Sequence, residues 1–170
     1  WHPRVLTRRL FTDRLLVREF RRYPLAKASS TRLPLKITLS DLGVRNAIFR
    51  GAPSLLESSP DVVGPLVETL VQTVIRDADL AVHFYRERIV PSDRRSRFEE
   101  VDFVAERTDG SVLPIEVKFR RRVDESDYPG LRQFIGRYEC AWGIVTTRDT
   151  FRPIADKVML IPVRDFLLAY

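Results

Sequence analysis

The sequence predicts an α/β domain in which a central mixed β-sheet is flanked by helices. Residues 98–106 and 112–119 both alternate between apolar and polar side chains, which is the period of a β-strand. Residues 62–77 repeat apolar side chains at helical spacing instead. A helix expected at 129–139 separates the strand at 112–119 from one at 142–147, and a helical connection of this kind joins parallel strands. These observations predict both antiparallel and parallel strand pairs.

The chain divides into a basic N-terminal extension, residues 1–60, and a main α/β domain, residues 61–170. Residues 1–35 are rich in arginine and predict basic helical turns. A short strand and a helix are expected within residues 36–50. Residues 51–60 are rich in Ser, Pro and Gly, which is typical of a loop.

The helix at 62–77 follows Asp61, a residue type that caps helices. Its apolar side chains form one broad face, and Glu68 lies at the edge of that face. From there the carboxylate could reach over the rim of the sheet. The alternative is a helical glutamate that simply faces solvent.

The next segments predict a hairpin with a defined register. We expect Val101, Phe103 and Ala105 on one face of their strand and Asp102 on the other. A three-residue loop, residues 108–110, would place Gly110 in the left-handed conformation that glycine tolerates. A two-residue Asp-Gly loop would instead turn the two apolar rows to opposite faces.

The three-residue loop pairs Val101 with Val117 and Phe103 with Ile115, and it sets Asp102 opposite Glu116. Directly opposed residues have Cβ atoms about 5 Å apart. Two carboxylates this close repel each other unless a cation lies between them.

Lys118 shares the face of Glu116 in this prediction. The alternative is a solvent-exposed ion pair, which contributes only about 0–1 kcal/mol. The coincidence of two acids in register, a lysine beside them and strongly apolar strands favours a functional site.

The remaining segments predict further elements on both sides of the hairpin. These are a strand at 80–88, an arginine-rich loop at 89–97, a strand at 158–163 and a short C-terminal helix.

The order of these elements resembles the PD-(D/E)XK (restriction-endonuclease-like) nuclease superfamily. The segments "GPLVETLV", "EEVDFVAE", "LPIEVKF" and "WGIVTT" resemble the C-terminal nuclease-like DUF4143 domain of a prokaryotic family of AAA-type ATPases. "KITLSDLGVRNAIF" resembles another segment of that family, although Thr38 stands where the family usually has an aromatic residue. The resemblance covers about residues 36–165.

This resemblance implies roles for five residues. Asp102 and Glu116 would bind Mg²⁺ or Mn²⁺ with help from the backbone carbonyl of Val117, and such hard oxygen ligands suit these ions. Glu68 would hold a metal-bound water. Lys118 would orient or deprotonate the attacking water, or neutralise charge on the phosphate.

Some relatives also place a glutamine on the helix after the Glu-x-Lys strand, where it contacts the site or the substrate. Gln133 occupies the corresponding helix and is a further catalytic candidate. The alternative is an ordinary helix residue.

Charge indicates a polyanionic partner. The chain has 29 Lys and Arg against 23 Asp and Glu, a net charge of +6. Arginine runs flank the two acidic strands, where guanidinium groups could grip phosphates, although they could serve solubility alone. The nucleic-acid-binding candidates are Arg94, Arg95, Arg97, Arg120, Arg121 and Arg122.

We therefore expect a Mg²⁺-dependent nuclease domain that hydrolyses DNA phosphodiester bonds. The alternative is a catalytically idle nuclease-like module that docks DNA or a partner for an AAA-type ATPase. A junction resolvase, which needs a homodimer, stays open as a third hypothesis. The sequence decides neither DNA against RNA nor endonuclease against exonuclease.

The sequence also bounds the setting of the protein. It contains no phosphate-binding G-x-x-x-x-G-K-[ST] motif, so an ATPase domain would lie outside this chain. The single cysteine, and the absence of a signal peptide or a membrane-length apolar run, predict a cytoplasmic protein without a membrane partner. The start at Trp1 suggests a fragment.

Overall fold

The computed structural model describes residues 17–23, 35–39, 43, 60–77, 80–89 and 97–169. Within these residues, groups of two or three consecutive strands are separated by helices. The strands are β1 (Val17–Arg22), β2 (Leu35–Leu39), β3 (Ala81–Ile89), β4 (Arg97–Glu106), β5 (Val112–Lys118), β6 (Gly143–Thr147), β7 (Arg152–Ala155) and β8 (Val158–Pro162). The helices are α3 (Pro60–Asp77), the 3-10 helix η2 (Glu125–Asp127), α4 (Pro129–Arg137) and α5 (Val163–Leu168).

All of these strands belong to one mixed sheet, in the order β2-β1-β3-β4-β5-β6-β8-β7. The pairs β5–β6 and β6–β8 are parallel, whereas β3–β4 and β4–β5 are antiparallel. Helix α4 connects β5 to β6, which confirms the predicted parallel crossover. The α/β class with a mixed sheet between helices is confirmed as well.

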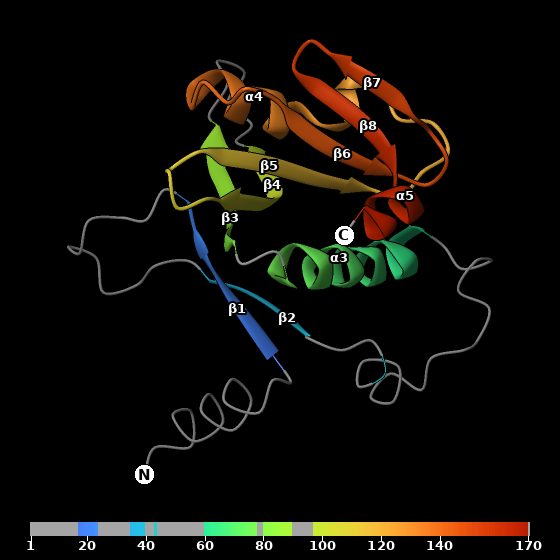
Figure 1. Cartoon of the computed structure of the whole chain (residues 1–170), viewed down its shortest axis with the longest axis horizontal. Helices are drawn as coiled ribbons and strands as arrows, with labels where there is room; N and C mark the ends of the chain where they lie inside the picture. Colours follow the sequence, from blue (N-terminus) through green and yellow to red (C-terminus); the bar gives the residue numbers. More distant parts are fainter. Residues whose placement is uncertain are drawn as a thin grey trace.

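Helices cover both faces of the sheet (Figure 1). Helices α3 and α5 lie on one face, where Val67 and Val71 pack with sheet residues such as Phe103 and Ile115. Helix α4 lies on the other face and packs around Phe134. We call these faces the α3 side and the α4 side.

The structure corrects the prediction of helical turns through residues 1–35. Residues Val17–Arg22 form β1, which pairs with β2 antiparallel and with β3 parallel. Phe20 anchors this strand: its side chain is buried, and its ring lies 5.8 Å from that of Phe103. Strand pairing and this aromatic contact outweigh the local composition on which the helical prediction rested. The rest of residues 1–35 falls outside the described part of the chain, apart from Tyr23 and Leu35.

The predicted hairpin register is confirmed where β4 and β5 pair. The ladder runs from Glu106–Val112 to Phe103–Ile115. Gly110 has a φ of 81°, as the three-residue loop requires.

Beyond Phe103 the alternation of β4 departs from the prediction. Between the pairs His83–Val104 and Tyr85–Val101, β4 uses two residues where β3 uses one, which is a β-bulge. Phe103 therefore packs on the α3 side, whereas Val101 packs on the α4 side with Val104. The expectation that Val101 and Phe103 share a face was wrong, because the extra residue turns the strand at Asp102.

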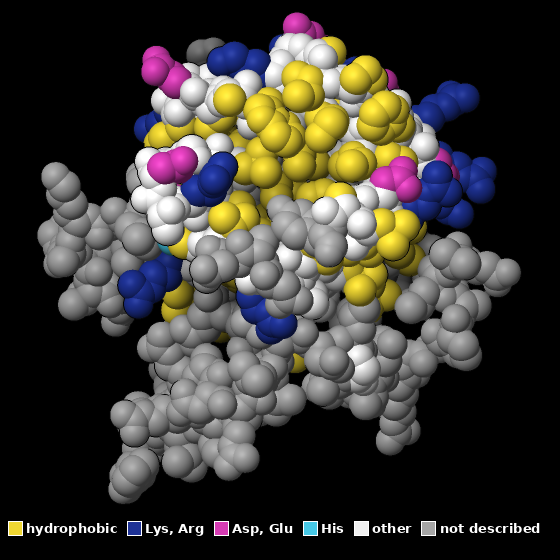
Figure 2. Space-filling view, in the orientation of Figure 1, with side chains coloured by type: hydrophobic (Ala, Val, Ile, Leu, Met, Phe, Trp, Pro, Cys, Tyr) yellow, Lys and Arg dark blue, Asp and Glu magenta, His cyan; other side chains and the backbone are white. Residues whose placement is uncertain are grey.

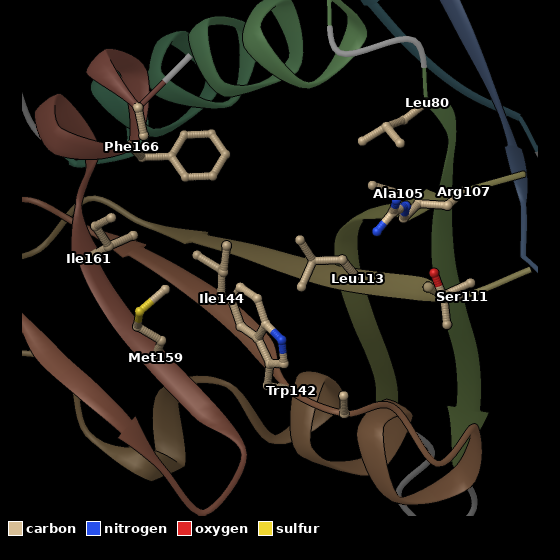
Figure 3. Close-up of a pocket in the computed structure, with 13 residues that line it drawn as sticks. Leu80, Ala105, Arg107, Ser111, Leu113, Trp142, Ile144, Met159, Ile161 and Phe166 are labelled. Atoms are coloured by element: carbon tan, nitrogen blue, oxygen red, sulfur yellow. The ribbon is translucent and has the colours of Figure 1, made fainter. Parts of the chain in front are cut away.

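An apolar hollow of about 670 Å³ lies beside β5, β6 and β8, next to α5 (Figure 3). Leu113, Trp142 and Phe166 are among its lining residues, and none of the lining residues that the structure describes is acidic. Figure 2 shows hydrophobic side chains gathered over this part of the sheet. The described lining of the hollow is therefore mainly apolar.

Candidate active site

Three carboxylates and two lysines converge from four elements. Glu68 comes from α3, Asp102 from β4, and Glu116 and Lys118 from β5, while Lys36 comes from β2. Lys36 Nζ lies 3.1 Å from Glu68 Oε2 and 3.2 Å from Asp102 Oδ1. Lys118 Nζ lies 2.7 Å from Glu116 Oε1. Each lysine thus contacts at least one carboxylate, and Asp102 and Glu116 lie next to each other in the middle of the cluster.

Asp102 and Glu116 meet where the β4–β5 backbone ladder ends. The Val117 N–H donates to Asp102 Oδ2 at 2.9 Å, and the Asp102 N–H lies 3.4 Å from Glu116 Oε2. Each carboxylate thus replaces a backbone carbonyl that the ladder would have supplied. The bulge in β4 makes these side-chain hydrogen bonds possible, because it places Asp102 where the backbone pairing between β4 and β5 stops.

Glu116 has an environment that opposes its charge. Its residue exposure is only 6%. Burial, and next the charge of Asp102, raise the pKa of Glu116 to about 8, even though Lys118 acts in the opposite direction. A cation placed between Asp102 and Glu116 would relieve this repulsion.

Glu68 shares part of that repulsion. Burial, and next the charge of Asp102, raise the pKa of Glu68 above its usual value, while Lys36 lowers it. The side chain is about one-quarter exposed, at 28%. Glu68 thus points from α3 toward the sheet, as predicted, and there it contacts Lys36 of β2.

Lys36 is a site residue that sequence reasoning missed. Burial lowers the pKa of this lysine, but Asp102 and Glu68 outweigh burial and raise it above the usual value. Two residues along β2, the Thr38 hydroxyl donates to Gln72 Oε1, one helical turn after Glu68. The alternate residues of β2 thus contact successive turns of α3. A polar side chain at every second position of "LKITL" was the available signal.

A polar pocket of about 400 Å³ opens beside the carboxylates. It lies between β4, the end of β5, η2 and the start of α4. Gly130 lets α4 approach β4, because a Cβ at this position would lie 2.3 Å from the Glu100 carbonyl oxygen. The lining residues that bear on the site are Glu99, Glu100, Asp102, Glu116, Lys118 and Asp127.

A family model described as "Domain of unknown function (DUF4143)" matches residues 63–166. The chain belongs to the DUF4143 family. The matched region of this DUF4143 protein contains Glu68, Asp102, Glu116 and Lys118, whereas Lys36 precedes it. Neither the curated proteins nor the solved structures gave a match. No helix in the described part of the chain is long and apolar enough to span a membrane.

Gln133 of this DUF4143 protein is not brought to the carboxylates. Its amide Nε2 lies 3.3 Å from Glu87 Oε2 on β3, and Arg137 binds the same carboxylate. Gln133 is also absent from the lining of the polar pocket. The described contacts therefore place it in a network that ties α4 to β3.

The arginine candidates separate into two groups. Arg120, Arg121 and Arg122 are exposed and follow Lys118 after one intervening residue, Phe119, so they lie at the end of β5 that carries the site. Arg120 is engaged with Asp127 at 2.8 Å. Arg94, Arg95 and the side chain of Arg97 lie outside the described residues.

The atoms available around Asp102 and Glu116 are oxygen ligands of the kind that Mg²⁺ prefers. Carboxylate oxygens and the nearby Val117 carbonyl are hard ligands, and Mg²⁺ usually keeps several waters and takes few protein carboxylates. Across the described residues, however, no group of three or more His, Cys, Asp and Glu is arranged to hold a metal ion. The fit therefore rests on two carboxylates, with Glu68 held apart by Lys36.

Proposed function

We propose that this DUF4143 domain is a Mg²⁺- or Mn²⁺-dependent nuclease that hydrolyses DNA phosphodiester bonds. The observation that carries the proposal is the Asp102–Glu116 pair at the end of the β4–β5 ladder, in which Glu116 is buried, Asp102 is half-buried and Lys118 lies beside Glu116. A carboxylate pair of this kind is costly to fold unless a cation uses it. The adjoining polar pocket gives a substrate access to these groups.

Asp102, Glu116 and the Val117 carbonyl would hold the metal ion. When bound, such an ion lowers the pKa of a coordinated water and polarises the phosphate. The two carboxylates are positioned for this role because each accepts a hydrogen bond from a backbone N–H of the opposite strand. Glu68, at the edge of the cluster, would hold a water rather than contact the ion directly.

Lys118 would stabilise charge on the phosphate. Burial lowers the pKa of Lys118, but Glu116 and Asp102 outweigh burial and raise it above its usual value. The ammonium therefore stays protonated at neutral pH, which favours charge neutralisation over removal of a proton from water. Its side chain is 24% exposed, so it can still face a substrate in the pocket.

The exposed Arg120, Arg121 and Arg122 would grip the phosphate backbone beside the site. Guanidinium groups bind phosphate oxygens without reading sequence. This assignment agrees with the net charge of +6 and implies salt-sensitive binding.

A second candidate is the catalytically idle module that docks DNA or a partner for an ATPase domain outside this chain. The observation that favours it is the pairing of Lys36 and Lys118 with the carboxylates, which neutralises most of their charge without a metal ion. A protein that needs only a folded surface could retain such a network.

Cleavage assays distinguish the two functions. Single-stranded, duplex and branched DNA, together with RNA, are incubated with the chain in Mg²⁺ or Mn²⁺. We expect wild type to cut DNA, and Asp102→Asn and Lys118→Met to lose at least about 100-fold in rate, the scale typical of removing one electrostatic stabiliser.

Lys157→Met serves as the control, because Lys157 bonds the Cys140 carbonyl away from the site. DNA binding without cleavage of any substrate, equal in wild type and all variants, would establish the docking module instead.

A further inference from the structure

We propose that Lys36 is a built-in counter-cation that occupies the position where a second metal ion would bind, so that the site accepts a single divalent ion. This inference rests on the proposed function, because it assigns the metal stoichiometry of the same site. Lys36 is a positioning residue in this proposal: it fixes the charge and orientation of Glu68 and Asp102.

The contacts of Lys36 are those expected of a bridging cation. Its Nζ lies 3.1 Å from Glu68 Oε2 and 3.2 Å from Asp102 Oδ1, so a single ammonium joins carboxylates from α3 and β4. The same Nζ lies 5.1 Å from the centroid of the Phe103 ring. A compact ammonium over an aromatic face and between two acids is well stabilised.

The backbone holds Lys36 in this place. Lys36 pairs with Phe20 of β1, and Phe20 packs on Phe103. On its other side, Thr38 is hydrogen-bonded to Gln72 of α3. The strand from which the ammonium projects is therefore fixed both to β1 and to α3.

Asp102 consequently faces two different cation positions. Its Oδ1 contacts Lys36, whereas its Oδ2 lies on the side of Val117 and Glu116. Lys118 contacts Glu116 through Oε1, and Glu116 Oε2 faces the Asp102 backbone. The first position is filled by the chain itself, and the second is the one proposed for the metal ion.

Charge limits the site to one ion. When Glu68, Asp102 and Glu116 are all ionised, three carboxylates against two ammonium groups leave one net negative charge. One divalent ion reverses that sign, and a second would add two more positive charges beside Lys36. Removal of the Lys36 charge vacates the position between Glu68 and Asp102 and restores a carboxylate pair that can bind an ion.

Mn²⁺ binding tests this inference without any activity measurement. Free Mn²⁺ is followed by electron paramagnetic resonance during titration of wild type, Lys36→Met, Lys36→Arg and Lys157→Met. We expect one ion per chain for wild type, Lys36→Arg and Lys157→Met, and two for Lys36→Met, with a spectrum broadened by coupling between the two ions.

Further variants test whether a change in the number of bound ions comes from the lost charge or from a damaged fold. Lys36→Gln keeps a hydrogen-bond donor without the charge and should also bind two ions. The double variant Lys36→Met/Glu68→Gln lacks one carboxylate of the vacated position and should return to one ion. Circular dichroism confirms that each variant is folded.

The outcomes separate this inference from the proposed function. One ion bound equally by wild type, Lys36→Met and Lys36→Gln overturns the role of Lys36 and leaves the metal site intact. Two ions bound by wild type overturn it as well. No Mn²⁺ binding by any variant contradicts the metal-dependent nuclease and, with it, this inference.

Discussion

Glu116 combines near-complete burial with a neighbouring carboxylate, and this combination makes its protonation part of folding. A carboxylate in such a place is favoured in its neutral form. The pKa of Glu116 is accordingly raised to about 8 in the folded chain, against 4.5 for an ordinary glutamate. In the absence of a divalent ion, its contribution to stability is full below the unfolded pKa and is lost as the pH rises through the folded value.

We therefore predict that the metal-free wild type loses stability between about pH 4.5 and pH 8 relative to Glu116→Gln. The difference should reach up to about 5 kcal/mol, which is what a shift of this size implies. Urea unfolding in EDTA at several pH values measures it. Parallel pH profiles for the two proteins would contradict the burial of an acid at this position.

At the residue scale, the sequence located the acidic pair but not its full surroundings. Asp102, Glu116 and Lys118 could be found because they lie within one hairpin, where spacing determines proximity. Lys36 and Gln133 could not be placed, because their contacts depend on tertiary packing. Lys36 reaches an acid 66 positions away. Gln133 bonds a residue 46 positions away.

At the scale of elements, α4 depends on close approach to β4. Gly130, at the second residue of α4, has no room for a side chain, whereas a Cβ added to Gly136 in the same helix would meet no atom within 4 Å. The two glycines therefore test packing and helix propensity separately.

We predict that Gly130→Ala destabilises the fold by about 1–3 kcal/mol or more, because the added methyl group overpacks the Glu100 backbone. Gly136→Ala should be neutral or stabilising by up to about 1 kcal/mol, because alanine is the better helix former. Thermal and chemical unfolding measure both. Equal effects of the two substitutions would argue against the tight contact.

Besides strand β1, the bulge in β4 and strand β7 escaped prediction for physical reasons. The bulge at Asp102 and Phe103 depends on how β4 pairs with β3, which local alternation cannot reveal. Strand β7 has only four residues and pairs only with β8, at the edge of the sheet. The hairpin register was predictable because Gly110 and the apolar rows of both strands favour the same loop.

At the scale of the whole molecule, exposed arginines lie both beside the proposed site and away from it. Arg121 and Arg122 are exposed just after β5, while Arg164 is exposed on α5 and lies beside Asp165 at 3.0 Å. If only net charge mattered, the loss of any of these arginines would weaken DNA binding equally. If DNA binds beside the site, the loss of Arg121 or Arg122 should weaken binding more than the loss of Arg164.

We predict that Arg121→Ala and Arg122→Ala each weaken DNA binding and reduce the slope of log affinity against log salt by about 1, as expected for the loss of one phosphate contact. Arg164→Ala should leave the slope unchanged. Fluorescence anisotropy across a salt series measures this. Identical slopes in all variants would place the nucleic-acid surface elsewhere.

The wide separation of Lys36, Glu68, Asp102 and Lys118 along the chain also bears on biosynthesis. A ribosome must release everything through β5 before these groups can meet, and such long-range pairings form slowly. An incompletely synthesised chain therefore lacks the assembled cluster of carboxylates and lysines. Its charged centre appears only once the sheet has closed around it.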